Sequence, residues 1–376
     1  MIRKLKEILC SFVLRFFSIF PLQKKIIFSS FDGKNYGDNP KALYLRLLSD
    51  YGETYRYIWL MYDTSVKIEG SEVVKAYSLR ALYHIATSKL WIHNSRQRIW
   101  IRKRRGQFYV QTWHGNIALK KIEKDAEATL PEIYIRQSKH DSKLADLFLD
   151  GSEWNAQNYR SSFWYSGEIL KVGLPRSDIF FEDSTSICKK INQIYDIKEN
   201  DRVILYCPTF RTDGRVDAYF TDYTYLIESL QASTLDKWKM IVRLHPNVQE
   251  TQKDLLTSPY ILDGSQIPDL NELIVRSEFV ITDYSSSMFD ALMIGKKVYL
   301  YVSDLDIYKN ERGQYFEVSS LPFSLSVDSS QLVSAILSDE AEKYKKEAEK
   351  FLRSCGLYER GNASQMTVKR LESILK

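Results

Sequence analysis

Residues 25–43 read KIIFSSFDGKNYGDNPKAL. Isoleucine and phenylalanine give residues 25–30 the β-branched and aromatic character of a short strand, and a loop rich in Gly, Asp and Asn then leads to Pro40. A helix is expected to follow at 41–49. This order of strand, loop and helix predicts the first unit of an α/β layer.

The same alternation recurs along the chain. Further strands are expected at 57–61, 90–93, 108–112, 146–149, 169–172, 203–207, 240–244, 279–282 and 298–301. The stretches between them are of the length of helical crossovers, and such alternation favours parallel sheets covered by helices. The sequence therefore predicts an α/β fold.

The composition changes once near mid-chain, where residues 181–201 are polar and charged. A length of 376 residues suits two domains. We expect two Rossmann-like, doubly wound domains at 25–190 and 198–338, preceded by a helix at 1–22 and followed by charged amphipathic helices at 339–376. In such domains the loops after the strands carry the chemistry.

The basic character of the chain is confined to its N-terminus. The net charge is +5, and the first 25 residues hold six basic side chains against the single acid Glu7, which accounts for all of it. A local excess suits a segment that meets an anionic surface, and it argues against a protein that binds nucleic acid.

Residues 8–22 are almost entirely apolar, but they are too few to span a membrane. The polar residues of the N-terminal segment share one helical stripe, at Lys4, Ser11, Arg15 and Ser18. This pattern is typical of an amphipathic helix in a membrane interface, with its cations toward lipid phosphates. The alternatives are a helix packed on the protein or a partner, and a secretory signal, although no small-x-small cleavage site precedes Pro21.

The four cysteines are scattered and the five histidines show no paired spacing. No P-loop, GxGxxG fingerprint, HExxH or EF-hand is present. We therefore expect no disulfide framework, no metal site and no cofactor, in a reducing cytosolic setting. Magnesium beside a substrate phosphate is left open.

His114 is the first candidate catalytic residue. It lies in the stretch Gln111-Thr112-Trp113-His114-Gly115, directly after an expected strand, and the glycine allows close approach of a ligand. A histidine at such a position suits proton abstraction near neutral pH. The alternative is a half-buried histidine that caps a turn.

Two further strand ends carry cations and a hydroxyl. Thr209 and Arg211 follow the strand at 203–207, while Arg243 and His245 follow the strand at 240–244. Arginine offers a fork of donors that matches phosphate oxygens, but an arginine paired with a carboxylate is at least as common.

The fourth candidate stretch is Thr282-Asp283-Tyr284-Ser285-Ser286-Ser287, in which a strand turns into an expected helix that contains Asp290. Serine hydroxyls and free N–H groups at a helix start suit a phosphate anion. Simple N-capping by serine is the alternative.

In this order, the motifs resemble those of the CDP-glycerol glycerophosphotransferase family of teichoic-acid and capsule synthesis. The motifs are SFDGKNYGDNPKAL (30–43), TWHG (112–115) with Lys120, SEWN (152–155), GLPRSD (173–178), LYCPTFR (205–211), RLHP (243–246), ITDYSSSMFDAL (281–292), and Tyr308 with Arg312-Gly313. The resemblance implies the two-domain glycosyltransferase-B type of fold. The chain departs from the family at residues 116–118, Asn-Ile-Ala, where a small hydroxyl residue and a proline are frequent.

The resemblance implies transfer of glycerol phosphate from CDP-glycerol to a hydroxyl of a membrane lipid-linked saccharide, with release of CMP, at the cytoplasmic face of the plasma membrane. His114 and His245 are then the expected catalytic residues. The expected substrate-binding residues are Thr209, Arg211, Arg243, Asp283, Ser285, Ser286 and Asp290. CDP-ribitol is the alternative donor, a nucleotide-sugar glycosyltransferase or epimerase the alternative enzyme, and a membrane-bound scaffold the non-catalytic alternative; homo-oligomerisation is left open.

A basic stretch at 96–105 holds six cations and no acid. It is either a second contact with anionic lipid or acceptor diphosphate, or a solvated loop.

Overall fold

The computed structural model describes residues 2–211, 217–244, 258–338 and 340–376. The chain forms two compact units. The first unit comprises Met1–Asn116, Ile122–Phe181 and Leu357–Lys376, and the second unit comprises Ile117–Lys121 and Glu182–Gly356.

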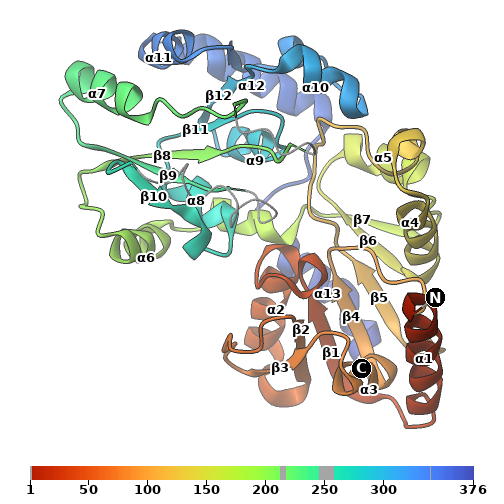
Figure 1. Ribbon diagram of the computed structural model, residues 1–376. Helices are drawn as coiled ribbons and strands as arrows, with labels where there is room; N and C mark the ends of the chain where they lie inside the picture. Colours follow the sequence, from red (N-terminus) through yellow and green to blue (C-terminus); the bar gives the residue numbers. More distant parts are fainter. Residues whose placement is uncertain (1, 212–216, 245–257, 339) are drawn as a thin grey trace. The chain divides into compact units, whose positions relative to one another are not determined.

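The first unit is built on a seven-stranded, wholly parallel sheet with the strand order β3-β2-β1-β4-β5-β6-β7 (Figure 1). Its strands are β1 (Gln23–Ser29), β2 (Arg56–Met61), β3 (Ser71–Lys75), β4 (Ser88–His93), β5 (Phe108–Gln111), β6 (Leu147–Asp150) and β7 (Glu168–Lys171). Its α-helices are α1 (Ile2–Phe17), α2 (Asp38–Tyr51), α3 (Leu79–Thr87), α4 (Glu132–Leu144), α5 (Glu153–Ser162) and α13 (Ala363–Leu375). Its short 3-10 helices are η1 (Phe31–Gly33), η2 (Gly52–Thr54), η3 (Glu123–Thr129) and η4 (Pro175–Phe181).

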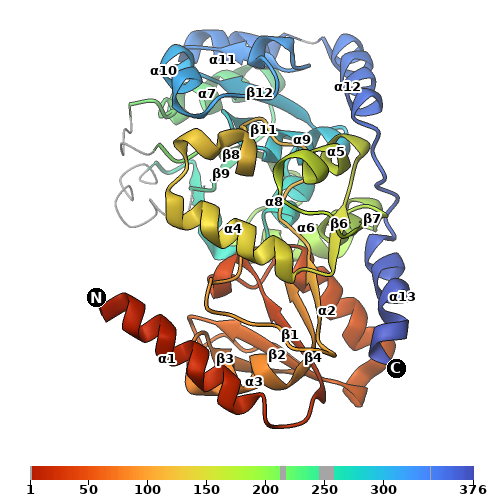
Figure 2. The same cartoon turned by 90° about the vertical axis from the view of Figure 1, so that its right-hand side faces the viewer.

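Strand β1 shows why the first sheet is buried on both faces. Ile26 and Phe28 pack in one core cluster with side chains of α2 and α13, whereas Ile27 packs in the other with side chains of α1 and α3. Figure 2 shows α1 beside α3 and α13 beside α2. Successive residues of a strand point to opposite faces, so a strand covered on both faces needs an unbroken apolar run.

The second unit is built on a six-stranded parallel sheet with the order β10-β9-β8-β11-β12-β13. Its strands are β8 (Arg202–Cys207), β9 (Trp238–Val242), β10 (Ile261–Asp263), β11 (Phe279–Thr282), β12 (Lys297–Tyr301) and β13 (Ser324–Ser326). Its α-helices are α6 (Thr185–Tyr195), α7 (Tyr223–Thr234), α8 (Leu270–Arg276), α9 (Ser287–Met293), α10 (Leu305–Arg312), α11 (Ser329–Leu337) and α12 (Ala341–Cys355). Short 3-10 helices lie at η6 (Gly264–Gln266) and η7 (Val318–Ser320).

The predicted α/β fold with two parallel sheets is confirmed, and every strand expected from the sequence is present within about two residues of its expected bounds. The strands that the sequence did not predict are β3, β10 and β13, which all lie at sheet edges. An edge strand has one neighbour and is only partly covered, so it lacks the continuous apolar run of a central strand.

The C-terminal residues, expected as one group of helices at 339–376, divide between the two units. Helix α12 belongs to the second unit, where Phe351 stacks on Phe289 of α9 with ring centroids 5.6 Å apart. Helix α13 belongs to the first unit, where Asp178 accepts hydrogen bonds from the N–H groups of Ala363 and Ser364, each 2.8 Å long. A carboxylate at a helix N-terminus stabilises the helix there.

In each sheet the chain starts in the middle and winds outward in both directions. The switch points lie between β1 and β4 in the first unit and between β8 and β11 in the second unit. Loops that leave the carboxyl ends of two such strands diverge to opposite faces and leave a crevice in which ligands bind.

Candidate active site

His114 follows β5, next to the switch point of the first unit. Its Nδ1 atom lies 2.8 Å from the backbone carbonyl oxygen of Asn94, the residue that follows β4. A carbonyl oxygen only accepts hydrogen bonds, so Nδ1 carries the proton and the lone pair of the neutral ring lies on Nε2. The ring also stacks on Trp113, with centroids 4.3 Å apart, and packs near Phe31 at 5.6 Å.

Partial burial lowers the pKa of His114 below its ordinary value. The hydrogen bond to Asn94 and the negative charge of Asp38 act in the opposite direction, while the positive charge of Arg176 adds to the lowering. A histidine with a lowered pKa is neutral at pH 7 and is able to accept a proton there.

The start of α2 holds the turn that carries His114. The side-chain amide of Asn39 donates to the carbonyl oxygens of Thr112 and Trp113, at 3.3 and 3.0 Å, and its Oδ1 atom accepts from the N–H of Arg176 at 3.0 Å. Asp38, buried beside it, forms an ion pair with Arg176 at 3.3 Å. The sequence does not indicate roles for Asp38, Asn39 and Arg176, although the stretches 30–43 and 173–178 that contain them follow predicted strands.

Asp283 organises the switch point of the second unit. It follows β11, and its carboxylate accepts from the N–H of Thr209 at 2.8 and 3.0 Å, from Arg211 at 2.8 Å and from the N–H of Tyr284 at 2.6 Å. The loops after β8 and β11 are therefore joined through one buried carboxylate. The structure thus brings three of the predicted substrate-binding residues together.

Arg211 is fully buried between two carboxylates. Its guanidinium group bonds to Asp283 at 2.8 Å and to Asp304 at 2.7 and 3.1 Å. Burial alone would lower its pKa, but the bonds to these two acids raise it overall. In this structure Arg211 joins three segments of the second unit, and its contact with a diphosphate stays a prediction.

An aromatic pair lies against this ion-pair cluster. Tyr284 stacks on Tyr308 with ring centroids 3.6 Å apart, and the Tyr284 hydroxyl donates to Asp304 at 3.0 Å. The ammonium group of Lys120 lies 4.8 Å from the centre of the Tyr308 ring. Lys120 belongs to the segment Ile117–Lys121, which enters the second unit three residues after His114 and pairs there with Gly313 and Tyr315.

The hydroxyl of Thr209 is buried and has no hydrogen-bond partner among the described residues. A buried polar atom without a partner is costly unless a ligand or water meets it. Thr209 therefore suits its predicted role as a substrate-binding donor. That role stays a prediction.

Arg243, directly after β9, is partly exposed and donates from Nη1 to the carbonyl oxygens of Gly264 and Ile267, at 2.5 Å each. Burial lowers the pKa of its guanidinium group. Arg243 thus holds the loop after β10 and keeps a cation beside the strand end. His245, expected in the same loop, lies outside the described residues.

The serines before α9 form a local cap. The Ser285 hydroxyl accepts from the N–H of Ser287 at 3.3 Å and from its hydroxyl at 2.9 Å. Ser286 is exposed and its side chain makes no capping bond, whereas Asp290 is buried in the first turn. The cap is present, and the predicted phosphate contacts of Ser285, Ser286 and Asp290 are not tested by these bonds.

Within the described part of the chain, no three His, Cys, Asp or Glu side chains are grouped so that they could hold a metal ion. No helix in the described ranges has both the length and the apolar character needed to cross a bilayer.

Comparison with known proteins agrees with the motifs. The chain is 29% identical over 377 residues to the teichoic acid poly(glycerol phosphate) polymerase of Bacillus spizizenii, a match that covers 96% of this chain and 95% of that protein. It is 29% identical over 381 residues to the teichoic acid glycerol-phosphate transferase of Staphylococcus aureus, and the match covers 97% of each.

A solved structure of the wall teichoic acid polymerase TagF matches with a TM-score of 0.85 at 25% identity, over 100% of this chain and 96% of that one. The expected fold of two Rossmann-like domains is thereby confirmed. The model of one protein family matches residues 12–373. The chain belongs to that family, CDP-glycerol:poly(glycerophosphate) glycerophosphotransferase.

Proposed function

We propose that this enzyme transfers glycerol phosphate from CDP-glycerol to a hydroxyl of a membrane lipid-linked saccharide and releases CMP, in the synthesis of teichoic acid. The proposal depends on one observation: the ring of His114, at a strand end of the first unit, is held with its proton on Nδ1. Family membership supports the donor. The CDP-polyol is the donor substrate, and the proposal includes no cofactor.

In the proposed reaction the acceptor hydroxyl loses its proton to Nε2 of His114. Its oxygen forms a bond to the phosphorus next to glycerol, and the bond from that phosphorus to the bridging oxygen breaks. CMP leaves with the bridging oxygen and its negative charge. Phosphoryl transfer of this kind depends mainly on positioning and on electrostatic stabilisation of that charge.

We assign the donor to the second unit. The Thr209 hydroxyl, the cation of Arg243, His245 and the serines at 285 and 286 are the proposed diphosphate ligands. Arg211 and Asp283 hold the loop of Thr209, since both bond to its backbone. Loss of one donor to the diphosphate is expected to cost on the order of 10²–10³ in rate, by analogy with the removal of an oxyanion-hole donor.

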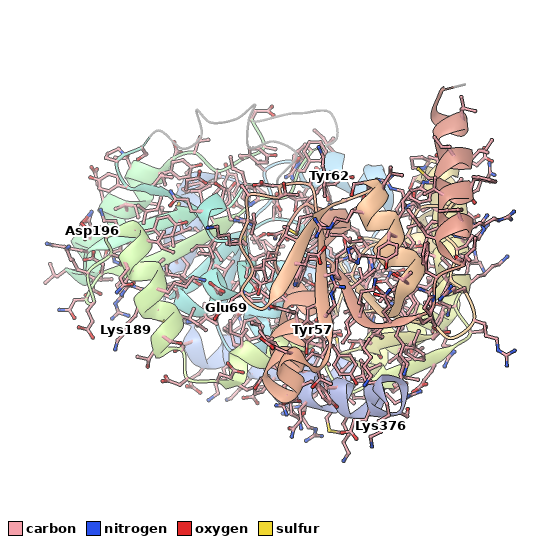
Figure 3. The ribbon with its side chains drawn as sticks, turned by 90° about the horizontal axis from the view of Figure 1, so that it is seen from below. Tyr57, Tyr62, Glu69, Lys189, Asp196 and Lys376 are labelled. Atoms are coloured by element: carbon pink, nitrogen blue, oxygen red, sulfur yellow. The ribbon has the colours of Figure 1, made fainter. Side chains whose placement is uncertain are left out.

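We propose a peripheral membrane location at the cytoplasmic face, and helix α1 supports the contact with a membrane. One side of α1 packs on the first unit through Leu14, which is 2% exposed, and through Val13 and Phe17. The opposite side leaves apolar side chains exposed, at Leu5, Ile8, Leu9, Phe12 and Phe16, and Ile19 and Phe20 continue this surface beyond the helix. Figure 3, in which Tyr57 and Lys376 are labelled, shows α1 at the edge of the first unit. An apolar stripe beside the exposed cation Arg15 suits an anionic lipid surface.

The basic stretch at 96–105 offers fewer exposed cations for contact with lipid than its total charge indicates. Arg96 is buried and paired with Glu123 and Asp141, Arg98 pairs with Asp32, and Lys103 pairs with Asp146. Arg104 donates to the carbonyl oxygen of Ser18, directly after α1. The exposed cations of the stretch are Arg102 and Arg105. These two residues, with α1, form the proposed lipid-binding surface.

The proposal is tested by nucleotide release, with and without a lipid-linked saccharide. CMP is measured with CDP-glycerol or CDP-ribitol as the donor, and UDP is measured with a UDP-sugar as the control. We expect release from CDP-glycerol that requires the acceptor and is lost in His114→Gln. The matched control is His140→Gln, because His140 is another half-buried histidine of the first unit, but it lies on α4 and bonds to the carbonyl oxygen of Ile101 and not to that of Asn94. Release of CMP from CDP-ribitol alone would show that the polyol of the donor is ribitol. Binding of only the UDP-sugar would contradict a CDP-polyol donor.

A further inference from the structure

Asp38 is the first residue of α2, in the first unit. It is buried, and its backbone adopts a left-handed conformation with φ of 61°, which is uncommon outside glycine. Its Oδ1 atom accepts from the N–H of Asn39 at 2.8 Å and from Nδ2 of Asn94 at 3.1 Å, and its Oδ2 atom pairs with Arg176 at 3.3 Å. Unusual backbone geometry that the surroundings maintain is frequent at functional sites.

Asn94 connects Asp38 to His114. Its side-chain oxygen accepts from the N–H of Phe31 at 2.7 Å, and its side-chain nitrogen donates to Ser30 at 3.2 Å as well as to Asp38. Its backbone oxygen is the atom that accepts from Nδ1 of His114. With three side-chain bonds to two segments around it, Asn94 holds this carbonyl group in one orientation.

We propose that Asp38 is a positioning residue for His114: through Asn94 it holds the ring with its lone pair on Nε2, and Arg176 holds Asp38 in turn. This inference rests on the proposed role of His114 as the base. The arrangement resembles the general scheme in which a base is oriented by a third group, but here a backbone carbonyl stands between the base and the acid.

The charges around the ring predict the direction in which the pKa of His114 shifts when one of them is removed. The charged groups that face His114 are Asp38 from α2, Arg176 from η4 and Glu123 from η3. Asp38 and Glu123 raise the pKa of His114, whereas Arg176 and burial lower it. Removing the charge of Asp38 must therefore shift this pKa opposite to the shift produced by removing the charge of Arg176.

The test is NMR titration of the histidine rings in the full chain, with the His114 signal assigned from His114→Gln. We expect Asp38→Asn to lower the pKa of His114 and Arg176→Gln to raise it. Asparagine is isosteric with aspartate and tolerates a left-handed backbone, so the fold is expected to persist. The matched control is Asp50→Asn, at the other end of α2 and about 18 Å away by the helical rise, which is expected to leave the pKa unchanged.

A purely structural role would loosen the site in both variants and move the pKa in one common direction, or not at all; either result overturns the inference. As a kinetic readout, Asp38→Asn is expected to lower kcat on the order of 10- to 100-fold with a smaller effect on KM, because misplacement of a base costs rate more than binding. The acid limb of the pH–rate profile of Asp38→Asn should lie at lower pH than the acid limb of the wild-type profile.

The two proposals fail separately. If His114→Gln releases CMP as fast as the wild type, the assignment of the base falls, whatever the titration shows. If His114→Gln is inactive but both charge variants leave the His114 titration unchanged, the base stands and the role of Asp38 falls.

Discussion

Arg211 and Asp283, separated by 72 positions in the chain, meet at 2.8 Å between the ends of β8 and β11. The same guanidinium reaches Asp304, in the loop after β12, at 2.7 Å. Three strand ends of the second unit are thus joined through one buried cation. All three residues are buried, so removal of one partner would leave a buried charge without compensation.

Replacement of Arg211 by leucine is expected to destabilise the second unit by about 3–5 kcal/mol, because it leaves two buried carboxylates without their partner. Urea unfolding followed by fluorescence measures the loss. The matched control is Arg370→Leu, which breaks a partly exposed pair with Glu168 and is expected to cost less than about 1 kcal/mol. Equal stability of the two variants would contradict the structural role of Arg211.

Acid is expected to destabilise the first unit through His93. Burial lowers the pKa of His93 to about 3, whereas the unfolded chain binds a proton near the ordinary histidine value of about 6.5. Between these values the unfolded state holds more protons, so the free energy of unfolding falls as the pH falls, by up to about 1.4 kcal/mol per pH unit.

Urea unfolding of the wild type at pH 7.5 and pH 5.5 tests this expectation. In His93→Phe the pH dependence should shrink, although the variant also loses the bond between His93 and Gln97. An unchanged pH dependence in that variant would show that His93 is not the group responsible.

Replacement of Phe12 and Phe16 by serine is expected to weaken binding to vesicles of anionic lipid about tenfold or more for each residue, because each exposed ring loses its burial in the interface. Flotation with vesicles measures this. Leu235→Ser is the control, since Leu235 is 91% exposed but belongs to the second unit. Equal binding of the Phe variants and the wild type would remove α1 from the lipid-binding surface.

Two glycines are expected to respond differently to alanine. Gly173 has a φ of +95°, and a Cβ atom there would lie 2.6 Å from Oε2 of Glu359, so Gly173→Ala should destabilise the first unit by about 1–3 kcal/mol. A Cβ atom on Gly115, beside His114, would meet nothing within 4 Å.

Gly115→Ala is therefore expected to leave the free energy of unfolding unchanged while it raises KM for the acceptor, because the added methyl group occupies space that a ligand would use. Thermal unfolding and steady-state kinetics separate the two effects. A Gly115→Ala variant with wild-type KM would show that no substrate approaches this glycine.

The candidate site was only partly predictable from the sequence. His114, Thr209 and Asp283 were recognised because each follows a strand whose apolar run marks it clearly. The sequence does not indicate roles for Asp38, Asn94 and Arg176, because the bonds of Asp38 reach across 56 positions to Asn94 and 138 positions to Arg176.

The sequence by itself determined the strands that are buried on both faces, since burial on two sides requires unbroken apolar runs such as Ile26 to Phe28. It also determined which residues stand at the strand ends. Only the tertiary structure decided which partners those residues bond to, because strand order selects the partners. With β8 beside β11, Arg211 meets Asp283 as a buried ion pair, and with β4 beside β5, Asn94 meets His114 and selects its tautomer.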